Sequence, residues 1–81
     1  MNKTRQKKLD KHYDSLSGIL EKIQAELDAE QDYFDNLSES KQESELGEVS
    51  QAVISALENA LGELESAMDS VAEARDSFDS E

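Results

Sequence analysis

The stretch that decides the fold runs from residue 9 to residue 34 and reads LDKHYDSLSGILEKIQAELDAEQDYF. Its large apolar side chains recur at alternating steps of four and three, followed by one step of seven: Leu9, Tyr13, Leu16, Leu20, Ile23, Leu27 and Phe34. Glu30 occupies the slot in which the missing apolar residue would fall. A repeat with a mean period of about 3.5 residues is the a/d pattern of a coiled coil. It predicts one long helix over about residues 4–34.

The C-terminal half carries a wider apolar stripe, made of three neighbouring rows. One row holds Leu46, Val53, Ala60, Ala67 and Ala74. The second row, with Ser50 in phase ahead of it, holds Leu57, Leu64, Val71 and Phe78. The third row holds Ile54, Leu61 and Met68. The chain has no Pro and only three Gly, which favours helix throughout. The stripe therefore predicts a second helix over about residues 41–78.

Residues 35–40 are expected to form the turn between the two helices, since Asx and Ser side chains favour turns and caps. Ser40 and Glu43 have the spacing of a capping box. A short connection makes consecutive helices antiparallel neighbours, so facing residue numbers should sum to about 80. The predicted fold is all-α, an antiparallel two-helix hairpin that resembles a coiled coil. It forms a single domain over residues 1–81.

Two helices alone bury little apolar surface. The facing pairs place the first two rows of the second helix in the seam, and they leave Ile54, Leu61 and Met68 without a partner on the first helix. We therefore expect these three residues to form a dimer seam, in which a two-fold axis relates two hairpins in a four-helix bundle. The alternative is a monomeric hairpin with a partly exposed row.

The charge of the chain is strongly negative and unevenly distributed. Eight Lys and Arg against twenty Asp and Glu give a net charge of −12. Residues 1–11 carry five basic and one acidic side chain, whereas residues 12–81 carry three basic and nineteen acidic ones. The basic start is expected to lie beside Glu73, Asp76, Asp79 and Glu81. Acidic surfaces repel nucleic acid, so the pattern favours a basic protein as the partner.

Charge density decides whether such a surface could imitate DNA. Helices of about 30 residues are roughly 45 Å long at 1.5 Å per residue. The acidic part then has about one net negative charge per 3 Å, against about one per 1.7 Å for duplex DNA. One hairpin is too dilute for mimicry, whereas two hairpins side by side come close.

Several chemistries lack the residues they need. With no Cys and one His, a disulfide framework and a Cys/His zinc site are excluded. Residues 28–39 place acidic groups at EF-hand positions, but Tyr33 stands where the calcium loop needs Gly. No metal, cofactor or enzymatic activity is therefore expected, because acid/base catalysis needs a desolvated carboxyl group. No apolar run is long enough for a membrane span or a secretory signal, so a cytoplasmic location is expected.

The segment from Glu30 to Ser40, followed by Gln42, Ser44 and Glu45, resembles small acidic helical-hairpin proteins of bacteriophages and prophages. Those proteins show an acidic-Gln-acidic-aromatic start, then Asp-Asn, an apolar residue, Pro-Glu and a Ser-Glu pair before a long helix. This chain has Ser38 at the expected Pro and Leu46 where a basic residue is common. The resemblance implies a viral origin and an accessory or counter-defence role in the host cytosol, and it transfers no functional residues.

We therefore predict a protein that binds a basic, nucleic-acid-binding host protein through its acidic helical surface, as a DNA mimic or anti-defence inhibitor. Tyr33 lies at an aromatic tip, either as an exposed contact or at the rim of the core. The candidate partner-binding residues are Tyr33, Asp35, Glu39, Glu58, Glu65, Asp69 and Glu73. The alternative is a structural coiled-coil module for assembly, in which the acidity only maintains solubility.

Overall fold

The computed structural model describes residues 2–80; Met1 and Glu81, which the predicted domain includes, lie outside the described residues. Helix α1 spans Lys3–Asp35, α2 spans Glu39–Gln42, α3 spans Glu45–Ser77, and a short 3-10 helix, η1, spans Phe78–Ser80. Residues 2–80 contain no strand. The all-α prediction is confirmed for this part of the chain.

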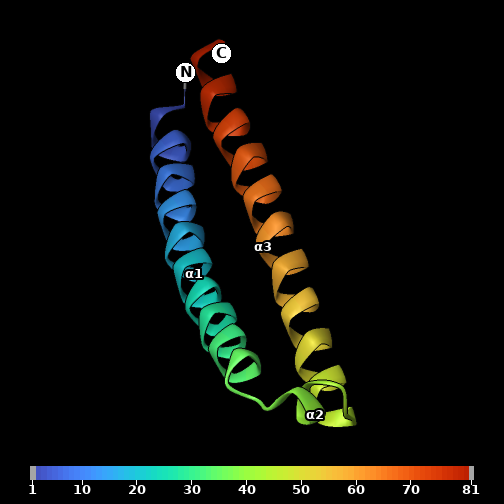
Figure 1. Ribbon diagram of the computed structural model, residues 1–81. Helices are drawn as coiled ribbons and strands as arrows, with labels where there is room; N and C mark the ends of the chain where they lie inside the picture. Colours follow the sequence, from blue (N-terminus) through green and yellow to red (C-terminus); the bar gives the residue numbers. More distant parts are fainter. Residues whose placement is uncertain (1, 81) are drawn as a thin grey trace.

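Helices α1 and α3 lie side by side and run in opposite directions, with the chain ends together at one end and α2 at the other (Figure 1). The resulting rod measures 61 × 15 × 12 Å. Two hydrogen bonds between the helices fix their register. Ser50 Oγ donates to Glu30 Oε2 at 2.6 Å, and Gln6 Nε2 donates to the Arg75 carbonyl at 3.0 Å. These pairs sum to 80 and 81, close to the predicted sum.

The predicted helix boundaries hold for α1 but not for the start of the second helix. Residues 39–42 form the separate helix α2, and α3 begins only at Glu45. The capping box predicted for Ser40 and Glu43 is wrong. Ser38 is the N-cap of α2, since its hydroxyl accepts a hydrogen bond from the Lys41 amide at 3.4 Å. Ser44 precedes α3 and makes no side-chain cap bond.

Gly47 allows α2 to pack against the start of α3 at the tip of the rod, which is the end opposite the chain termini. A Cβ atom at this position would collide with the backbone carbonyl of Gln42, so α2 and α3 approach each other only because residue 47 has no side chain. The Gln42 side chain also donates to the Phe34 carbonyl at 3.0 Å. Phe34 and Leu37 are half-buried and close the end of the seam.

The seam between α1 and α3 is thin. On α1, all seven apolar residues of the predicted repeat are half-buried. On α3 and η1, covered positions recur at steps of three and four: Gly47, Ser50, Ile54, Leu57, Leu61, Leu64, Met68, Val71, Arg75 and Phe78. Ala60 and Ala72, beside this series, are also half-buried. Only Leu61, at 9% exposure, and Met68, at 7%, are buried hydrophobic residues among those described. The chain therefore has a very small core.

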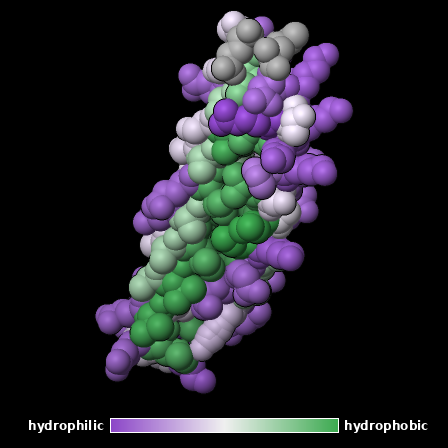
Figure 2. Space-filling model, turned by 180° about the vertical axis from the view of Figure 1, so that it is seen from behind, coloured by the Kyte–Doolittle hydropathy of each residue, from purple (hydrophilic) through white to green (hydrophobic). Residues whose placement is uncertain are grey.

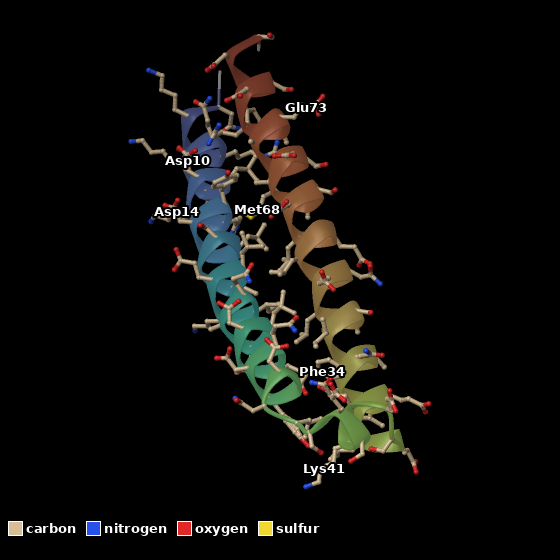
Figure 3. The ribbon with its side chains drawn as sticks, in the orientation of Figure 1. Asp10, Asp14, Phe34, Lys41, Met68 and Glu73 are labelled. Atoms are coloured by element: carbon tan, nitrogen blue, oxygen red, sulfur yellow. The ribbon has the colours of Figure 1, made fainter. Side chains whose placement is uncertain are left out.

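The assignment of Ile54, Leu61 and Met68 to a dimer seam is wrong. These side chains lie in the seam with α1, and Figure 3 shows Met68 between the two helices. The row that contains Leu46 and Val53 turns outward instead, with 46% and 38% of these residues exposed. Burial is worth about 25 cal/mol per Å² of apolar surface, so the row with the larger side chains gains more from contact with α1 than a row rich in Ala.

Candidate protein-binding surface

Four carboxylates follow one side of α3, at steps of seven, four and four residues. We call Glu58, Glu65, Asp69 and Glu73 the acidic strip. Residues at these spacings lie on neighbouring lines of a helix surface. All four side chains are exposed, and Figure 3 shows Glu73 on the side of α3 that faces away from α1. The structure thus places four of the predicted partner-binding residues on one surface.

A shallow groove between α1 and α3 runs beside the acidic strip. Its first part is lined by Leu20, Glu21, Gln24, Ala25, Asp28 and Glu65. Its second part is lined by Tyr13, Leu20, Glu65, Met68 and Asp69. The groove therefore combines apolar side chains with carboxylates from both helices. This combination suits Lys and Arg, which have aliphatic stems and charged ends.

The acidic strip has no basic side chain of its own to neutralise it. The sequence contains no Lys or Arg between Lys41 and Arg75. Within residues 2–80, the only ion pairs join Arg75 to Asp76 at 3.1 Å and to Asp10 at 3.2 Å. Hydrogen bonds first with Asp76 and then with Asp10 raise the pKa of Arg75. Both of these carboxylates lie outside the strip, so the negative charge of the strip remains available to a partner.

The basic start of the chain lies beside the C-terminal end, as expected (Figure 1), and the Arg5 guanidinium lies 5.1 Å from the centroid of the Phe78 ring. Glu81 of the expected acidic stretch lies outside the described residues. Lys3, Lys7, Lys8 and Lys11 are exposed and form no ion pair within the described part of the chain. Asp79 instead accepts a hydrogen bond from Gln6 Nε2 at 2.9 Å. The rod therefore keeps a basic end and an acidic body as separate surfaces.

The other three predicted residues lie at the tip, away from the acidic strip. Tyr33 and Asp35 belong to the last turn of α1, Glu39 begins α2, and all three are exposed. Tyr33, at 39% exposure, lines a hollow with Leu46, Val49 and Val53. Tyr33 thus lies on the apolar side of the rod, so the seven predicted residues do not form one surface.

A second surface opposes the acidic strip across the seam. We call it the apolar strip: Leu46, Val49, Val53, Ala56, Ala60, Ala67 and Ala74. Val49 is 56% exposed, and Figure 2 shows a hydrophobic band along this side of the rod. The three rows predicted from the sequence do not include Val49 and Ala56. One signal could have identified Val49 and Ala56 as exposed. Ser50 and Glu30 are polar residues at core positions of the two repeats, and their numbers sum to 80, so they predict a buried polar pair. That pair would have indicated which rows of the second helix face the first.

Comparisons with protein-family models, with curated proteins and with solved structures find no match to this chain. The resemblance to phage proteins therefore stays a prediction. Residues 2–80 contain no group of three or more His, Cys, Asp or Glu arranged to hold a metal ion. No helix in this range combines the length and the apolar character that crossing a membrane requires.

Proposed function

We propose that the two antiparallel helices act as one hairpin-shaped rod that binds a basic surface of a partner protein. The observation that carries this proposal is the groove in which carboxylates from α1 and α3 surround apolar side chains and, within residues 2–80, form no ion pair with Lys or Arg. An Arg or Lys of the partner would lay its stem on Leu20 and Met68. Its charged end would meet Glu21, Glu65 or Asp69.

The length of the rod limits how closely it imitates DNA. A net charge of −12 over 61 Å gives about one negative charge per 5 Å, against about one per 1.7 Å for duplex DNA. Two rods side by side would reach about one per 2.5 Å. We therefore propose that a single rod binds exposed Lys and Arg, and that occlusion of a DNA-binding site on a host protein is a property of paired rods.

The proposed role is that of a phage-type accessory protein in the host cytosol, as the resemblance of residues 30–45 implies. It involves no catalytic step and no cofactor. The partner is a protein and not a nucleic acid, because the phosphate backbone and the acidic strip would repel each other.

A pull-down from a bacterial lysate at low and at high salt tests this function. Exposed charges are screened within about 10 Å at 0.1 M salt, so a basic partner should be captured at low salt and released at high salt. The test variant is Glu58→Gln/Glu65→Gln/Asp69→Asn/Glu73→Gln, which should lose the partner. The matched control neutralises four exposed carboxylates outside the strip: Asp14→Asn, Asp32→Asn, Glu45→Gln and Glu63→Gln.

The control variant has the same net charge as the test variant, so it separates the strip from general acidity. Retention of the partner by the control and its loss by the test variant would support the proposal. Equal capture by the wild type and both variants would contradict it.

The second candidate function is a structural coiled-coil module, and the exposed apolar strip favours it. Such a module would assemble through apolar contacts that tolerate high salt, since burial of apolar surface is not weakened by charge screening. Substitution of Val53 by Glu would abolish assembly, whereas neutralising the acidic strip would leave it intact.

A further inference from the structure

Within residues 2–80, every residue of the apolar strip except the half-buried Ala60 is exposed, and the rod exposes more surface than its mass requires. Its accessible surface is 5862 Å², whereas a globular monomer of 9.0 kDa has roughly 4,900 Å². The excess of about 1,000 Å² is close to the 800 Å² that each partner buries in a typical stable interface. One face of 61 × 15 Å is large enough to supply this area.

We propose that a second copy of the chain covers the apolar strip, with α3 antiparallel to the partner's α3 and Ala60 on the two-fold axis. Facing residue numbers then sum to 120. Leu46 meets the partner's Ala74, Val53 meets the partner's Ala67, and Ala60 meets the partner's Ala60. Each large side chain is opposed by a small one, which fills the interface evenly and lets the helices approach closely.

On the side of α1 that borders the apolar strip, residues would also form favourable pairs across the same two-fold axis. Arg5 and His12 line one hollow on this side, Tyr33 lines another, and Ile19 is 45% exposed. The row repeats every seven residues and also includes Glu26. Antiparallel pairing of this row places Ile19 against the partner's Ile19, His12 against the partner's Glu26 and Arg5 against the partner's Tyr33. These are an apolar pair, an imidazole with a carboxylate, and a cation with an aromatic ring.

Charge selects the antiparallel arrangement of the two rods. The basic end, with exposed Lys7, Lys8 and Lys11, then lies beside the tip of the second copy, where the partner's Glu39 and the partner's Glu43 are located. If the two tips lay together, the basic ends would coincide and the acidic bodies would be aligned, so like charges would repel. The acidic strip lies on the other side of the seam and stays uncovered. Binding of a basic surface by a single rod therefore does not need the pairing, whereas the proposed occlusion of a DNA-binding site rests on it.

Sedimentation equilibrium of the full chain at tens of micromolar tests the pairing. We expect twice the 9.0 kDa chain mass. Val53→Glu places a charge in the interface and should give the single-chain mass. Ser66→Glu adds the same charge at an exposed position of α3 outside the strip, and it should leave the dimer intact.

A cysteine at the two-fold axis tests the geometry, because the natural sequence has no Cys. Ala60→Cys should form a disulfide-linked dimer on mild oxidation, since a disulfide needs Cα atoms within about 7 Å. Ser66→Cys, on the outer side of α3, should not.

Four results would overturn the proposal: a wild type with the single-chain mass, a dimer that survives Val53→Glu, a dimer in which Ala60→Cys forms no disulfide, and a monomer that binds phosphatidylcholine vesicles through the strip. The last result would assign the apolar strip to a lipid surface.

Discussion

The two sides of the α1–α3 seam belong to the same pair of helices and carry opposite chemistry. On one side, Glu58 and Glu65 project beside the core row of Leu57 and Leu64. On the other side, Val53 and Ala60 occupy the equivalent positions beside Ile54 and Leu61. A rotation of α3 by one row would place different residues on both sides. The rows of α3 that pack against α1 therefore determine which side of the rod is charged and which is apolar.

The largest predicted effect is the difference in stability between a substitution in the seam and the same substitution in the apolar strip. Leu61→Ala should lower the free energy of unfolding by about 2–4 kcal/mol, because it removes buried methyl groups and leaves a cavity. Leu46→Ala makes the same chemical change at a residue with 46% exposure. In dilute protein it should cost about 0.5 kcal/mol or less. Urea unfolding of both variants measures the difference, and equal losses would show that α3 uses other rows.

The next effect compares two glycines of α3. Gly47→Ala should destabilise the protein by about 1–3 kcal/mol, because the added methyl group collides with the Gln42 backbone. At Gly62, on the acidic side, an added Cβ atom would have no neighbour within 4 Å. Gly62→Ala should therefore stabilise the helix by up to about 1 kcal/mol. Thermal unfolding that shifts in the same direction for both variants would contradict the account of the tip.

A smaller effect concerns the polar pair of Ser50 and Glu30 inside the seam. Ser50 is 3% exposed and donates to Glu30 at 2.6 Å. Ser50→Ala should cost about 1 kcal/mol, because the Glu30 carboxylate loses a hydrogen-bond partner. Glu30→Leu added to Ser50→Ala should recover this loss by making the site apolar on both helices. A double variant less stable than the single one in urea would refute this reading of the pair.

The smallest effect concerns the self-repulsion of the acidic side. Salt screens repulsion between exposed carboxylates, so an increase in NaCl from low to physiological concentration should raise the melting temperature. The variant with the neutralised acidic strip should respond less than the wild type. A melting temperature that rises equally for the two proteins would place the repulsion elsewhere on the rod.

The sequence predicts well the features for which its apolar pattern allows only one way of packing. The narrow repeat from Leu9 to Phe34 has only one apolar face, so the extent of α1 and its inward residues follow directly. The stripe of α3 covers several adjacent rows, and periodicity alone does not say which of them faces α1. The sequence therefore predicts Ile54, Leu61 and Met68 on the outside, although they form the centre of the seam.

The candidate surface is predictable only in part, for the same physical reason. Glu58, Glu65, Asp69 and Glu73 are exposed whichever rows are chosen, because no basic residue nearby could neutralise them in a core. Tyr33 depends on the rotation of α3, since its neighbours are Leu46 and Val53. The break at residues 43–44 depends on the close contact of Gly47 with Gln42, which is a tertiary contact that no local pattern shows.

The salt dependence of binding tests the role of the acidic strip most directly. The affinity for the captured basic protein would be measured over a range of NaCl concentrations for the wild type, the strip variant and the control variant with equal net charge. The account predicts a steep loss of affinity with salt for the wild type and the control, and a weak, nearly salt-independent affinity for the strip variant. The same salt dependence and affinity for the strip and control variants would contradict it.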